Sequence, residues 1–136
     1  MKISSEFSKF ASSYNSYNII QNKVIDRLLS KISTEPKNIL DIGCGNGALI
    51  KKIDWEYQRF VGVDFAKGML ELHPTSKNIE LIYGDFNDDA IFQKLSKYRF
   101  DYLFSASALQ WADNLEKVFQ HLVKLDVKVN LAIFTS

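Results

Sequence analysis

The chain has 136 residues, 46% of them hydrophobic and 24% charged, and this composition predicts one globular domain with a single core. A formal net charge of +1 excludes an overall field that would draw the protein to nucleic acid or to an anionic membrane. Cys44 is the only cysteine, which excludes an internal disulfide and a cysteine-rich zinc cluster and favours a reducing compartment.

Segments that direct a chain to a membrane or out of the cell have recognisable sequence patterns. No apolar run here approaches the ~20 residues of a membrane span, and "MKISSEFSKF" lacks the hydrophobic block of a secretory signal. We therefore expect a cytoplasmic protein without a membrane or nucleic-acid partner.

The N-terminal part is predicted to be helical. Residues 1–18, rich in Ser, Asn, Phe and Tyr, are expected to form a short helix and a turn. Over residues 18–33, apolar side chains recur at three- and four-residue spacing, which predicts a helix with one apolar face that ends before Pro36. We interpret residues 1–36 as a helical lid and residues 37–136 as a sheet core within one domain.

The core alternates between two patterns. Residues 38–42, "NILDI", are apolar almost throughout, which is typical of a strand covered on both faces. Alternation of such strands with helices of about ten residues predicts right-handed crossovers and a parallel α/β sheet with helices on both faces. The predicted strands are 38–42, 59–64, 79–85, 100–106 and 129–134, and the predicted helices between them are 48–53, 66–72, 89–98 and 114–125.

Three glycines follow the first strand, in "NILDIGCGNGALI". Gly43, Gly45 and Gly47 allow positive φ and close approach of a ligand, and they exceed what a tight turn needs. Gly43-x-Gly45-x-x-Ala48 satisfies the loose pattern of a dinucleotide loop, in which a diphosphate rests on a helix N-terminus. Asp41 would repel a diphosphate, however, and suits a ligand that carries an ammonium and a sulfonium group.

The order Asp-x-Gly-x-Gly-x-Gly in "LDIGCGNG" resembles the signature of class I S-adenosylmethionine (SAM) methyltransferases. The resemblance implies SAM as cofactor and S-adenosylhomocysteine (SAH) as product. It also implies a Rossmann-like sheet of about five strands in the order 3-2-1-4-5, without the last two strands that are usual in that fold.

Acidic residues also close the second and third predicted strands. Asp64 can accept hydrogen bonds from both ribose hydroxyls of a nucleoside, or it can cap the next helix. Phe65 and Met69 would then flank the adenine, although either could equally belong to the core. In "YGDF", Asp85 can accept from an adenine amino group and Phe86 can contact the purine, whereas Gly-Asp also favours a simple turn.

Cys44 and the two histidines form no nucleophilic or metal-binding constellation in the sequence. No histidine lies near Cys44 to activate it, so we interpret Cys44 as a small apolar residue that lines the loop. His73 and His121 are expected to be packing or surface residues.

The stretch "FDYLFSASALQWADNLEKVF" resembles carboxyl O-methyltransferases, closest to the malonyl-acyl-carrier-protein enzymes of the biotin pathway, with the trans-aconitate enzymes as relatives. "FSKFASSYNSYNIIQ", near the N-terminus, is similar to the opening of the same family. The resemblance implies that Ser105 lies at the cofactor and that Tyr14 contacts the methionine carboxylate. It places Tyr17 in the lid and Gln110 and Trp111 on the floor of the substrate channel, although Gln110 could instead cap the next helix and Trp111 pin it to the sheet.

The implied reaction needs no catalytic acid or base, because an acceptor carboxylate is already ionised at neutral pH. The expected substrate is a carboxylate of a small molecule or of a carrier-bound acyl group. Family members continue beyond "NLAIFTS" with further helices and strands that help to build the acceptor pocket, so a SAM-binding module without catalysis is the alternative. A nucleotide-dependent oxidoreductase is a third hypothesis for the function. The last strand would lie at an open sheet edge, which favours a homodimer.

Overall fold

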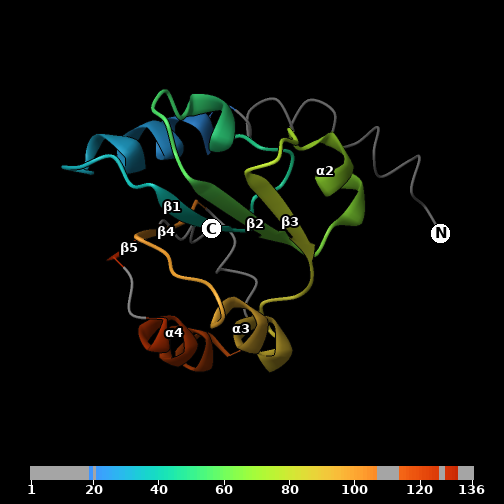
Figure 1. Cartoon of the computed structure of the whole chain (residues 1–136). Helices are drawn as coiled ribbons and strands as arrows, with labels where there is room; N and C mark the ends of the chain where they lie inside the picture. The colour runs from blue at the N-terminus through green and yellow to red at the C-terminus, as the bar shows by residue number, and fades with distance from the viewer. Residues whose placement is uncertain (1–18, 20, 107–113, 126–127, 132–136) are drawn as a thin grey trace.

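The computed structural model of the chain describes residues 19, 21–106, 114–125 and 128–131, which Figure 1 draws in colour. Residues 21–30 form a helix, as the apolar periodicity predicts. The other elements in chain order are β1 (Asn38–Ile42), the 3₁₀ helix η1 (Ile50–Lys52), β2 (Arg59–Asp64), α2 (Lys67–Leu72), β3 (Ile79–Tyr83), α3 (Asp89–Leu95), β4 (Tyr102–Ser105), α4 (Leu115–Lys124) and β5 (Lys128–Leu131).

The five strands form one parallel sheet in the order β3-β2-β1-β4-β5, which confirms the predicted order. β1 is central: Leu40 pairs with Val61 of β2 and with Leu103 of β4. None of these three side chains has exposed surface. An apolar strand of this kind is stable here because neighbouring strands satisfy its backbone while helices cover both faces of the sheet.

Helices cover the sheet on both faces (Figure 1). α3 and α4 lie on one face, and the helix of residues 21–30 lies with α2 on the other. Successive strand residues point to opposite faces and therefore enter two separate cores. The core beneath α3 and α4 includes Ile42, Val63, Phe92, Leu95, Val118 and Leu122. The core beneath the helix of residues 21–30 includes Ile25, Leu28, Ile39, Phe60 and Phe104. Among the described helices, none is long and apolar enough to cross a bilayer.

Several elements are shorter than the sequence patterns indicate, and β4, for example, covers Tyr102–Ser105 rather than residues 100–106. The predicted helix over 48–53 is reduced to η1, because Gly47 has φ of 98° and the backbone over 45–49 forms turns. β3 ends at Tyr83, because the carboxylate of Asp85 accepts from the N–H of Asn87 and turns the chain away from the sheet. α3 ends at Leu95 rather than at residue 98. β1 and β2 end where the sequence predicts, at Ile42 and Asp64, whereas β3 ends two residues earlier than predicted.

Candidate functional site

The carboxyl ends of β1, β2 and β3 lie at one edge of the sheet, because the three strands are neighbours and run in parallel. Ligands of open α/β sheets bind at this edge. The loop of residues 43–47 follows β1, residues 65–66 follow β2, and residues 84–88 follow β3. These connections carry most of the described residues that the sequence identifies as a candidate site.

The loop after β1 has the backbone geometry that its glycines predict. Gly43, Gly45 and Gly47 have φ of 78°, 56° and 98°. The N–H groups of Gly43 and Cys44 both donate to the carbonyl of Val63, at 2.7 and 3.0 Å. The loop is therefore tied to the end of β2.

Two of these glycines have different surroundings. A Cβ built on Gly47 would lie 2.5 Å from Cδ of Pro74 and 3.3 Å from Cδ2 of His73, so Gly47 allows close packing inside the protein. A Cβ built on Gly45 would have no heavy atom within 4 Å. The space beside Gly45 is open, and a side chain there would fill it. This arrangement is a cradle for a ligand that approaches the backbone closely.

Asp64 joins the glycine loop to the start of α2. Its Oδ2 accepts from the N–H of Gly45 at 2.7 Å, and its Oδ1 accepts from the N–H of Ala66 at 2.8 Å. Ala66 is the N-cap residue of α2, so the helix-start interpretation of Asp64 has structural support. Because a carboxylate offers about four acceptor positions, both bonds are compatible with additional donors from a ligand.

Asp41 is the second carboxylate of this edge. It is 3% exposed, and no hydrogen bond to its carboxyl occurs among the described residues. Burial, and then the charge of Asp64, raise the pKa of Asp41 well above that of an ordinary aspartate. A cation that reached Asp41 would therefore meet a carboxyl group to which no described residue donates a hydrogen bond.

Cys44 packs against the sheet. A Cβ on Gly62 would lie 2.7 Å from Sγ of Cys44, so the missing side chain of Gly62 makes room for the thiol. Burial raises the pKa of the Cys44 thiol, and the neighbouring charges of Asp41 and Asp64 raise it further. The thiol is thus neutral at physiological pH, which agrees with a packing role.

A pocket of about 230 Å³ lies between the tips of β2 and β3 and is lined by Phe65, Asp85, Phe86 and Asn87. Three of these residues are predicted from the sequence, and the fold brings them together. Phe65 is 56% exposed whereas Phe86 is 4% exposed, so one ring offers a free face and the other is anchored in the core. Met69 is half-buried on α2 and is not among these lining residues.

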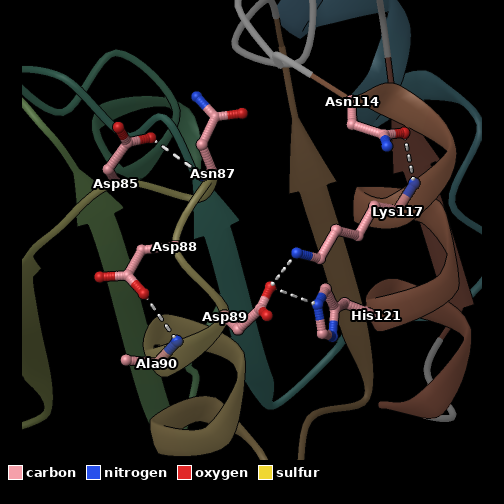
Figure 2. A network of polar contacts seen from close by, with 8 residues as sticks. All are labelled: Asp85, Asn87, Asp88, Asp89, Ala90, Asn114, Lys117 and His121. Atoms are coloured by element: carbon pink, nitrogen blue, oxygen red, sulfur yellow. Dashed lines mark hydrogen bonds and ion pairs between the residues drawn. The ribbon is translucent and has the colours of Figure 1, made fainter.

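Asn87 is a pocket residue that the sequence analysis missed. Figure 2 shows its N–H donating to Asp85 Oδ1, at 2.9 Å. Next along the chain, the carboxylate of Asp88 accepts from the N–H of Ala90 at 3.0 Å and caps α3. The spacing of Asp85 and Asn87, two apart after a strand, is typical of an Asx turn and was the available signal.

Both described histidines are packing residues, as expected. His73 is 3% exposed, its ring lies 5.9 Å from that of Phe60, and burial lowers its pKa. His121 stacks on Phe92 with ring centroids 4.6 Å apart and contacts Asp89 at 3.0 Å. Figure 2 shows Lys117 on the same Asp89 carboxylate, so this contact joins α3 to α4. In the part of the chain that the structure describes, no group of three His, Cys, Asp or Glu side chains could hold a metal ion.

Ser105 is fully buried, and its hydroxyl donates to the carbonyl of Ile42 at 3.0 Å. This bond ties the ends of β4 and β1 together. Ser105 has no exposed surface in the described structure. The other predicted site residues, Tyr14, Tyr17, Gln110 and Trp111, lie outside the described residues.

Several known proteins are similar to this chain in sequence or in fold. A malonyl-[acyl-carrier protein] O-methyltransferase of Ilyobacter polytropus is 33% identical over 89% of this chain and 48% of its own length. The chain thus spans about half the length of the curated relatives it matches.

Two solved structures share the fold. The plantazolicin methyltransferase BamL, solved with a triazolic desmethylPZN analog and SAH, has a TM-score of 0.60 at 22% identity, and the match covers 91% of this chain and 46% of BamL. A chain from the complex between the Haloferax volcanii Trm112 methyltransferase activator and its "putative methyltransferase" has a TM-score of 0.70 at 16% identity. The match covers 95% of this chain and 59% of that chain. The family model described as "methyltransferase domain" matches residues 39–125, more than half of the sequence, and the chain therefore belongs to the methyltransferase domain family.

Proposed function

We propose that this chain binds SAM at the tips of β1, β2 and β3 and that it methylates a carboxylate of a small molecule or of a carrier-bound acyl group. The observation that carries the proposal is the open space beside Gly45, next to the buried carboxylates of Asp41 and Asp64. Bare backbone and acidic side chains suit a cationic nucleoside, whereas the charged carboxylate of Asp64, which two backbone N–H groups stabilise, would repel the diphosphate of a dinucleotide.

In this proposal, each strand tip holds a different part of the cofactor. The backbone of Gly43, Cys44 and Gly45 receives the methionine part, and Asp41 pairs with its ammonium group. Asp64 accepts from the ribose hydroxyls through the acceptor positions that Gly45 and Ala66 leave unused.

The pocket between β2 and β3 receives the adenine. Asp85 accepts from the amino group, while Phe65, Phe86 and Met69 contact the ring. Ser105 would act indirectly in this arrangement, because its hydroxyl holds the end of β4 against β1.

SAM supplies a methyl group on a sulfonium, which an ionised carboxylate can take by in-line displacement without a general base. The chain's task is to orient the acceptor and to exclude water, and orientation alone can be worth roughly 7–11 kcal/mol. We assign the exclusion of water to the lid of residues 1–36, with Tyr14 and Tyr17, and the acceptor floor to Gln110 and Trp111. The acceptor class is supported by the similarity of the chain to malonyl-[acyl-carrier protein] O-methyltransferases.

Calorimetry with SAH is the first test, because product binding needs no acceptor. Wild-type protein should bind SAH, and Gly45→Val should not, because the new side chain fills the open space. Unchanged affinity in Gly45→Val, or a preference for NAD, would contradict the site assignment.

Transfer of labelled methyl from SAM to malonyl-carrier protein tests the acceptor. Acetyl-carrier protein is the matched control because it has no free carboxylate. SAH binding without methylation of any carboxylate would favour the alternative, a SAM-binding module without catalysis.

We also propose that a second copy of this chain docks along β5 and α4. β5 lies at the edge of the described sheet, and α4, which connects β4 to β5, has an open hollow of about 660 Å³. Val123 in this hollow is 78% exposed. Glu116 and Lys124 line the hollow and stand four sequence positions before and after Gln120, so two antiparallel α4 helices would pair opposite charges across a two-fold axis.

Sedimentation equilibrium tests this partner. Val123→Asp should shift the protein from dimer to monomer, because it places an unpaired charge in the apolar hollow. Leu72→Asp is the matched control, since Leu72 is 67% exposed but lies on α2, on the other face of the sheet. A wild-type protein that stays monomeric at high concentration would contradict the proposal.

A further inference from the structure

Asp41 occupies an unusual position for a carboxyl group. It lies on the central strand β1, where it pairs with Gly62 of β2 and with Phe104 of β4. It is 3% exposed. Because strand residues alternate, its side chain lies on the same face as Ile39, which is the face covered by the helix of residues 21–30.

The two carboxylates of the site have opposite surroundings. Asp64 receives two backbone N–H groups, from Gly45 and Ala66, and these donors stabilise its negative charge. Asp41 receives no hydrogen bond from any described residue. A buried charge without a donor or a cation is strongly unfavourable.

The charged and titratable groups around Asp41 do not relieve this cost. From β2 it faces Asp64, a second acid, and from the glycine loop it faces the Cys44 thiol. No lysine, arginine or histidine among the described residues acts on it. Burial and Asp64 both favour the neutral acid, and the pKa of Asp41 is accordingly raised.

We propose that Asp41 carries a proton in the ligand-free protein and exchanges it for the ammonium group of the cofactor. The inference rests on the proposed function and deepens it. The O–H bond of Asp41 breaks, the proton passes to solvent buffer, and the carboxylate that remains pairs with the ammonium group. Asp41 is then the residue that selects a ligand with a positive charge at this point, and binding is linked to pH.

The proton balance of binding tests this exchange. Titrations of wild-type protein with SAH are run at one pH near 6.5 in two buffers with different ionisation enthalpies, phosphate and Bis-Tris. The difference in apparent enthalpy should correspond to about one proton released per SAH bound. Affinity should rise up to tenfold per pH unit as the pH increases toward 7, a range in which the α-amino group of the ligand stays charged.

Matched ligand and variant controls isolate the ammonium group and Asp41. 5′-Methylthioadenosine has the same nucleoside but no amino acid part, and it should bind without proton release. Asp41→Asn should bind SAH more weakly and without proton release, while Asp54→Asn, which removes an exposed carboxylate, should behave as wild type. Proton release that persists in Asp41→Asn would overturn the inference.

A ligand-free measurement provides an independent readout. Below about pH 3 an aspartic acid is neutral in both the folded and the unfolded protein. As the pH rises, the unfolded chain releases the Asp41 proton first, so the wild type should lose stability relative to Asp41→Asn up to the folded pKa. A constant difference between pH 4 and 7 would overturn the inference. SAH binding without proton release would overturn the exchange alone, whereas failure to bind SAH at any pH would refute the proposed function as well.

Discussion

Alanine substitutions at two glycines of the same loop should separate binding from folding. Gly45 and Gly47 both have positive φ, and a side chain in this conformation costs about 1–2 kcal/mol. At Gly45 this is the whole cost, because the added Cβ meets no heavy atom within 4 Å. We therefore expect Gly45→Ala to lower the free energy of unfolding by about 1–2 kcal/mol.

Gly47→Ala carries an additional packing penalty. The Cβ would lie 2.5 Å from Cδ of Pro74, in a rigid ring that cannot rotate away, and 3.1 Å from Cγ2 of Ile50. Overpacking of this kind costs about 1–3 kcal/mol, so the free energy of unfolding should fall by about 2–5 kcal/mol in total.

The effect on SAH affinity should be larger for Gly45→Ala than for Gly47→Ala, the reverse of the effect on stability. Gly45→Ala places a methyl group in the open cradle and should weaken SAH binding at least tenfold, which is about 1.4 kcal/mol. Gly47→Ala, measured where it is still folded, should retain affinity within a few-fold. Urea unfolding gives the free energy of unfolding of each variant, and calorimetry gives the SAH affinity of each. If both variants lose stability equally, the packing argument is wrong; if Gly45→Ala binds SAH as the wild type does, the loop is not the ligand site.

Three further substitutions test other parts of the site. Asp64→Ala should lower the free energy of unfolding by about 1.5–3 kcal/mol even without ligand, because Gly45 and Ala66 lose a charged acceptor, and urea unfolding measures this. Gly68→Ala should raise it by about 0.5–1 kcal/mol without changing SAH affinity, since a Cβ on this exposed helical residue meets nothing within 4 Å. For His73, burial lowers the folded pKa below 6.5, so the unfolded state takes up the proton first as the pH falls. As the pH falls from 7 to 5, the wild type should lose stability relative to His73→Phe, by at most about 1.4 kcal/mol per pH unit. Thermal unfolding of both proteins across this pH range measures the difference, and a difference that does not change with pH would refute the assignment.

The elements of this protein follow from local sequence patterns. "NILDI" predicts a strand buried on both faces, and the structure has one between Val61 and Leu103, at the centre of the sheet. The glycines predict positive φ after that strand, and the structure confirms it. These features are readable because a strand's periodicity and a glycine's freedom depend on residues within a few positions of each other.

The surroundings of each site residue were decided only by the tertiary structure. The sequence has the same Gly-x-Gly spacing around Gly45 and Gly47, yet one faces open space and the other faces Pro74, which is 27 positions away in the chain. Likewise Asp41 and Asp64 lie at or next to the last residue of neighbouring strands, but among the described residues only Asp64 receives backbone donors. Burial, charge and hydrogen bonding depend on which distant segments pack together, and a one-dimensional pattern does not contain that information until the sheet is assembled.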